Sequence, residues 1–96
     1  MYIAAIRALL KLTDRGTLKD KRRVVKGFLA EMERECRVSV AETGWQDSTA
    51  FFEAGLCKAT SDHRVAERVI DHVSRRIYED PRFCYVELRT EIIPMG

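Results

Sequence analysis

Cationic side chains gather in one short stretch, Thr17 to Lys26, directly after an apolar run with the pattern of a strand. The stretch is Thr-Leu-Lys-Asp-Lys-Arg-Arg-Val-Val-Lys, and five of its ten residues are Lys or Arg. Such a cluster favours anions, and phosphates along a nucleic-acid backbone can engage several cations together. Together with one cation of the preceding loop, the candidate nucleic-acid-binding residues are Arg15, Lys19, Lys21, Arg22, Arg23 and Lys26.

This stretch is predicted to begin a helix. Thr17 and Asp20 have the form of a capping box, and the apolar residues that follow recur at intervals of three, four and seven. At about 100° per residue, most of the cations fall within about a third of the helix circumference, whereas Asp20, Glu31 and Glu35 fall on another part of it. The cations that share this side are Lys19, Arg22, Arg23, Lys26 and Arg34. The functional interpretation is a contact with RNA or another polyanion; the alternative is a solvated helix face.

Strand and helix patterns alternate along the whole chain. Period-two alternation predicts strands over residues 2–12, 37–43 and 83–93 and within 50–60, and a second helix starts at Ser61 or Asp62 and ends before Pro81. The order strand, helix, strand, strand, helix, strand is that of a ferredoxin-like α+β sandwich. We therefore expect one domain over residues 1–96, in which a four-stranded antiparallel sheet carries two helices on one face. The first and third strands should be central.

The other face of this sheet should have no helix to cover it. It is either solvated or buried in an oligomer, so a module that assembles through its open sheet face is the alternative function. A conventional RNA-recognition motif is excluded, because the outward side of the first strand carries no aromatic residue, and only one of the adjacent Phe51 and Phe52 can face outward. The residues expected on this face are Ile3, Arg7, Leu9, Lys11, Glu87, Arg89 and Glu91.

Nothing in the sequence specifies a reaction. His63 and His72 have no Ser or Cys at a spacing that forces a nucleophile–base contact, and no glycine-rich phosphate loop occurs. We therefore expect a non-enzymatic domain with no cofactor. Cys36, Cys57 and Cys84 are an odd number at wide spacing, which indicates reduced, buried thiols and no metal site.

Charge and hydropathy limit the classes of partner. The net charge is only +2, too small for a general nucleic-acid binder, so any electrostatic function depends on where the charges lie. No apolar run approaches the roughly 20 residues that span a bilayer, and the first residues lack the basic region of a secretory signal. We expect a cytoplasmic location and no membrane partner.

The basic stretch also carries a family resemblance. Together with the Val-Ser-Val-Ala-Glu run that starts at Val38, and with Gly44, Gln46-Asp47 and Gly55, it resembles the YlxP-like family of bacterial domains of unknown function. Members usually carry Ser and Glu in place of Thr17 and Asp20, and His in place of Trp45. The resemblance implies a ferredoxin-like fold, a bacterial cytoplasmic setting, and genes near those for ribosome maturation and translation initiation. It therefore favours RNA or the ribosome as a partner, and it supplies no catalytic residue.

Overall fold

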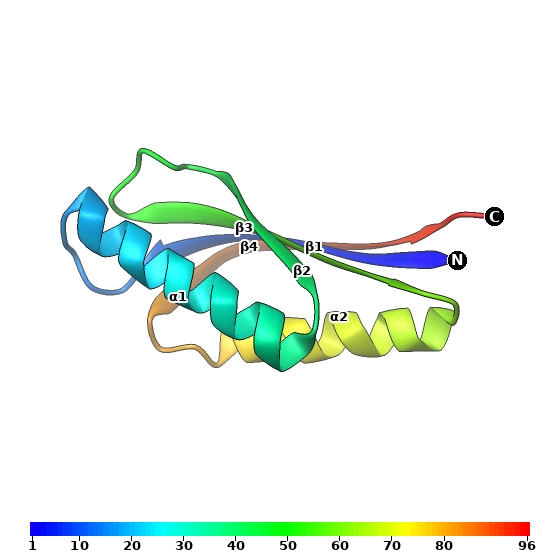
Figure 1. Cartoon of the computed structure of the whole chain (residues 1–96). Coiled ribbons are helices and arrows are strands. Elements are labelled where there is room, and N and C mark those ends of the chain that lie inside the picture. Colours follow the sequence, from blue (N-terminus) through cyan, green and yellow to red (C-terminus); the bar gives the residue numbers. More distant parts are fainter.

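The computed structural model describes all 96 residues, which form four strands and two helices. The sheet has the order β2-β3-β1-β4 with antiparallel neighbours, and both helices lie on one of its faces (Figure 1). This arrangement confirms the predicted ferredoxin-like α+β sandwich, including the central position of the first and third strands. The elements are β1 (Tyr2–Leu12), α1 (Leu18–Cys36), β2 (Ser39–Gly44), β3 (Phe51–Thr60), α2 (His63–Tyr78) and β4 (Phe83–Pro94).

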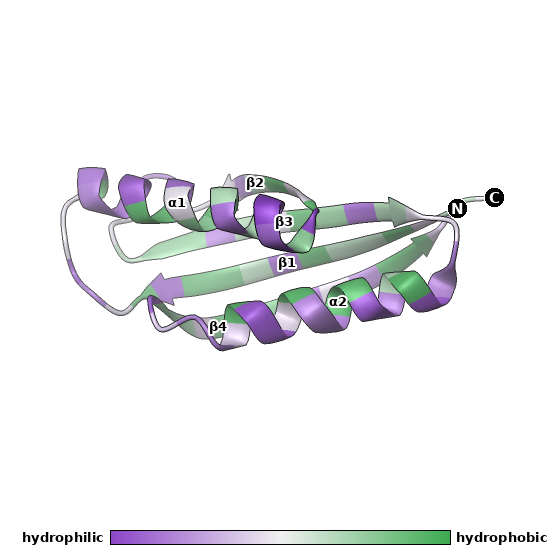
Figure 2. Cartoon of the chain, turned by 60° about the horizontal axis from the view of Figure 1, so that its bottom comes forward, coloured by the Kyte–Doolittle hydropathy of each residue, from purple (hydrophilic) through white to green (hydrophobic).

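The hydrophobic core lies between the sheet and the two helices. Alternate residues of β1 point into it, and α1 contributes the residues of its apolar side, so the green sides of both helices in Figure 2 face the sheet. Three aromatic rings meet at its centre: Phe28 packs against Phe52 and Phe83 with centroids 5.8 and 4.9 Å away. Phe52 is thus the inward member of the Phe51–Phe52 pair, as the alternation requires.

The start of α1 agrees in detail with the sequence pattern. The Thr17 hydroxyl accepts a hydrogen bond from the Asp20 backbone N–H at 3.1 Å, and the Asp20 carboxylate accepts one from the Thr17 N–H at 3.0 Å. The capping box is therefore confirmed. Neither α1 nor α2 is long and apolar enough to span a membrane.

The prediction that all three cysteines are buried was wrong for two of them, which lie on the open face of the sheet. Cys36 is buried, but Cys57 and Cys84 are exposed. Cys57 lies opposite Ala5, and Cys84 lies opposite Lys11 on the edge strand β4, both on the face that no helix covers. Strand alternation places every second residue on this face regardless of its hydropathy. Only one of the three thiols is therefore part of the core.

Candidate nucleic-acid interface

The first half of α1 and the loop before it present a group of exposed cations, here called the basic ridge. Its members are exposed, and none takes part in an ion pair or donates a side-chain hydrogen bond within the protein. The helix lies over the sheet with its N-terminus at one end of the molecule, and its outer side there is hydrophilic (Figures 1 and 2). The basic ridge consists of Arg15, Lys19, Arg22, Arg23 and Lys26.

Lys21 does not belong to the basic ridge, which corrects its place among the candidate residues. Its side chain is only 1% exposed and lies on the core side of α1. The Lys21 Nζ donates a hydrogen bond to the Trp45 carbonyl at 2.7 Å and lies 3.3 Å from a carboxylate oxygen of Glu42. At about 100° per residue, position 21 falls on the same side as Val25 and Phe28, so helical geometry carries a signal for its burial. Its charge holds the β2–β3 loop against α1.

The N-terminus of α1 is also less open than the sequence indicates. Asp20 accepts hydrogen bonds from the Thr17 N–H and from the Thr17 hydroxyl, so the chain's own carboxylate occupies the position where an external anion would bind. These hydrogen bonds, first that of the backbone and then that of the hydroxyl, lower the pKa of Asp20 from its ordinary value. Anion binding at this end must therefore depend on the side chains of the basic ridge.

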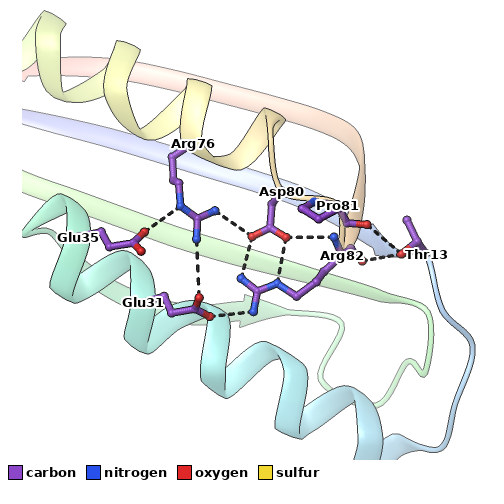
Figure 3. A network of polar contacts seen from close by, with 7 residues as sticks. All are labelled: Thr13, Glu31, Glu35, Arg76, Asp80, Pro81 and Arg82. Carbon is purple, nitrogen blue, oxygen red and sulfur yellow. Dashed lines mark hydrogen bonds and ion pairs between the residues drawn. The ribbon is translucent and has the colours of Figure 1, made fainter.

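The other carboxylates of α1 that face its neighbours are engaged away from the basic ridge. Glu31 and Glu35 point toward α2 and the loop after it (Figure 3). Glu31 pairs with Arg82 at 2.7 Å, and Glu35 pairs with Arg76 at 2.8 Å. These two ion pairs connect α1 with α2 and with the loop that follows α2. Glu31 and Glu35 are therefore paired with arginines outside α1 and do not neutralise the cations of the basic ridge.

Asp80 is the centre of this polar network and is only 4% exposed. Its carboxylate accepts hydrogen bonds from the Arg82 backbone and guanidinium at 2.7 to 3.0 Å and from Arg76 at 2.9 Å. Burial by itself raises the pKa of Asp80, but the hydrogen bonds from Arg82 and Arg76 outweigh it, so the pKa lies well below its usual range. The Arg82 guanidinium also lies over the Phe28 and Phe83 rings, at 5.7 and 5.6 Å from their centroids. The network thus rests directly on the aromatic core.

An aromatic pair of exposed Trp45 and half-buried Phe51 lies on the other side of the sheet, at the β2–β3 loop. Trp45 is 53% exposed, and its ring centroid lies 5.3 Å from that of Phe51. Its backbone has φ 64°, in the left-handed region, and this conformation is held by the hydrogen bond from Lys21. Sequence patterns did not assign Trp45 a role. The signal in the sequence for such a role was a single Trp that directly follows the turn residue Gly44.

The cations of α2 form a separate and less concentrated group. Arg64, Arg68 and Arg75 are exposed, and α2 begins at the end of the sheet opposite to the start of α1 (Figure 2). The exposed carboxylates Glu67 and Asp71 lie among them, and Glu67 is 2.7 Å from the imidazole of His63. Positive charge is thus concentrated at the end of the molecule where α1 begins, and not at the end where α2 begins (Figure 2).

An open four-stranded sheet with two helices on one face, and with a basic ridge on the first of them, defines a small ferredoxin-like α+β domain. No group of three or more His, Cys, Asp or Glu side chains is placed to hold a metal ion. The family described as "Protein of unknown function (DUF503)" matches residues 3–90, and the chain belongs to this family. The chain is 31% identical over 78 residues to the "Uncharacterized protein YlxP" of Bacillus subtilis (strain 168), an alignment that covers 81% of this chain and 85% of that protein.

Proposed function

We propose that this domain binds RNA, free or within a ribonucleoprotein such as the ribosome, through the basic ridge. The observation that carries the proposal is that five exposed cations are collected at one end of α1 and that none forms an ion pair with a carboxylate of the same chain. Unpaired cations on adjacent helical turns suit a ligand with regularly spaced phosphates. The function proposed is binding without catalysis.

The composition of the basic ridge determines the kind of contact. Lys and Arg side chains on an exposed helix bind phosphate oxygens, and such contacts position a nucleic acid without reading its sequence. The ridge contains no aromatic or amide side chain that could pair with a base edge. We therefore expect affinity that depends on salt and varies little with RNA sequence.

Reversing two charges tests the proposal. The double variant Lys19→Glu with Arg23→Glu should bind a fluorescein-labelled RNA hairpin about a hundredfold more weakly than the wild type, measured by fluorescence anisotropy at about 0.1 M salt. Two phosphate contacts are lost, and two repelling charges replace them. Both positions are exposed, so the fold should be retained, which circular dichroism verifies.

A matched control is available on α2. Arg64→Glu with Arg68→Glu makes the same change in net charge at exposed positions at the other end of the sheet. This control should lose no more than a few-fold in affinity, through the change in overall charge. Equal losses in the two double variants would show that RNA senses only total charge, and the proposed location would be wrong.

A further inference from the structure

The open sheet face contains a hollow lined by small side chains together with the charged Arg7, Glu53, Arg89 and Glu91. Ala5, Ala41, Gly55 and Cys57 lie on neighbouring strands of this face, and the hollow above them has a volume of about 930 Å³. Gly55 leaves room here for the Thr43 methyl group, because a Cβ at this position would lie 2.8 Å from the Thr43 Cγ2. The hollow therefore lies toward one end of this face, where small residues of β1, β2 and β3 are neighbours.

The other end of the same face carries a bulky projection. Exposed Trp45 and half-buried Phe51 pack together here, and the Lys11 Nζ lies 5.7 Å from the centroid of the Phe51 ring. Leu9 and Trp45 line the same small depression beside them. Because Lys21 anchors the backbone of Trp45 from below, the projection is held in place before any partner arrives.

The charges of this face balance, but most of them are unpaired. Arg7 and Glu53 form an ion pair at 3.0 Å. Arg89 lies directly opposite Arg7 across β1 and β4 and has no carboxylate partner, while Glu87 is likewise without a cation. A like-charged neighbour in the same sheet is unfavourable for Arg89. A carboxylate of a partner that packs on this face would offset the repulsion between Arg89 and Arg7.

We propose that two copies of this chain pack open face to open face about a two-fold axis that lies between the two sheets, perpendicular to their strands, and passes over β1 at Ala8. In the register of β1 and β4, Glu87 lies opposite Leu9 and Arg89 lies opposite Arg7. Glu87 and Arg89 therefore lie one residue to either side of Ala8 along the strands. The axis exchanges them and places Arg89 of each copy over Glu87 of the other. It also places the aromatic projection of each copy over the hollow of the other, because the two features lie at opposite distances from Ala8 along β2 and β3.

The size of the face is sufficient for such an interface. Four strands about 4.8 Å apart, with about ten residues on average and a rise of about 3.3 Å per residue, present about 600 Å² per copy. Two such faces bury about 1,200 Å² in total, the lower limit for a stable specific interface. The equal numbers of cations and carboxylates on this face suit a second copy and not a polyanion. The six charged residues are Arg7, Lys11, Arg89, Glu53, Glu87 and Glu91.

Charge exchange tests the geometry. In sedimentation equilibrium without RNA, the wild type should form a dimer, and Arg89→Glu or Glu87→Arg should each weaken it at least tenfold, because two like-charged contacts form per dimer. The double variant Arg89→Glu with Glu87→Arg should regain most of the affinity. Arg68→Glu, on the outer side of α2, is the matched control and should leave the dimer unchanged.

The inference is overturned if the wild type stays monomeric at its highest soluble concentration. It is also overturned if the single variants dimerise as the wild type does, or if the double variant fails to recover. Thermal unfolding of each variant establishes that the exposed substitutions leave the fold intact. The measurement contains no RNA, so its outcome is independent of the proposed function, and a failure of either leaves the other standing.

Discussion

An Asp80→Asn variant should lose about 3 kcal/mol of unfolding free energy, a large part of the stability of a domain of this size. The carboxylate of Asp80 is buried and accepts hydrogen bonds from two guanidinium groups. An amide would turn N–H donors toward these groups and leave their charges with less compensation. The loss lies at the lower end for a broken buried ion pair, because Arg76 and Arg82 are partly exposed and keep Glu31 and Glu35 as partners. Urea unfolding at neutral pH measures it.

The dependence of this loss on pH provides a second test of the same network. The pKa of Asp80 is lowered in the folded protein from an ordinary value of 3.8, so its ionised form adds stability above that pH. This contribution is lost as the pH falls below about 4 toward the lower pKa of the folded state. The stability difference between wild type and Asp80→Asn should therefore be constant from pH 7 to about pH 5 and become smaller in stronger acid. A difference that persists unchanged at about pH 3 would contradict the assignment.

The control for the network is Glu35→Gln. Glu35 pairs with Arg76 at 2.8 Å, but its side chain is 42% exposed. An exposed ion pair contributes at most about 1 kcal/mol, so this substitution should cost far less than Asp80→Asn. Equal losses for the two variants would mean that burial does not set the strength of the network.

The second large effect is expected from Lys21→Met. Methionine has a similar length and volume, so packing is largely kept while the charge is lost. The Trp45 carbonyl and the Glu42 carboxylate would lose the cation that lies 2.7 and 3.3 Å from them. We expect a loss of about 2–4 kcal/mol in unfolding free energy, because buried polar groups are left without a partner. Trp45 is the only tryptophan of the chain, so its fluorescence should report the loosened β2–β3 loop directly.

Lys26→Met is the matched control for this experiment. Lys26 lies on the exposed side of α1, and removing its charge should change the unfolding free energy by no more than about 0.5 kcal/mol. For RNA affinity the order of the two variants should be reversed. Lys26→Met should weaken RNA binding, and Lys21→Met should leave it nearly unchanged. If both lysines affected RNA binding equally, the separation between the buried lysine and the basic ridge would be wrong.

Local patterns were sufficient to predict the order of the elements. The alternation of β1, the capping box formed by Thr17 and Asp20, and the helix stop before Pro81 each depend on residues close in the sequence. The uncovered sheet face follows from the same order, because both crossovers must place their helices on one side. These features required no knowledge of distant contacts.

Contacts between distant segments explain what was missed. A lysine is ordinarily expected at the surface, but Lys21 can be buried because the Trp45 carbonyl, 24 residues away, accepts a hydrogen bond from its Nζ. The polar network joins Glu31 to Arg82 across 51 residues, and no local pattern relates them. In β4, the register shift between Leu9 and Leu10 leaves Val86 exposed, whereas alternation assigns it to the core side. These contacts join segments that are distant in the sequence, whereas the exposure of Cys57 and Cys84 follows from strand alternation alone.

The salt dependence of RNA binding tests the central claim most directly. With five phosphate contacts, the logarithm of the association constant should fall with the logarithm of the salt concentration with a slope of about −3.5 to −4.5. An anisotropy titration of the labelled RNA hairpin at several salt concentrations gives this slope. A slope between zero and about −1, or no binding at low salt, would contradict the account of the basic ridge as an RNA-binding surface.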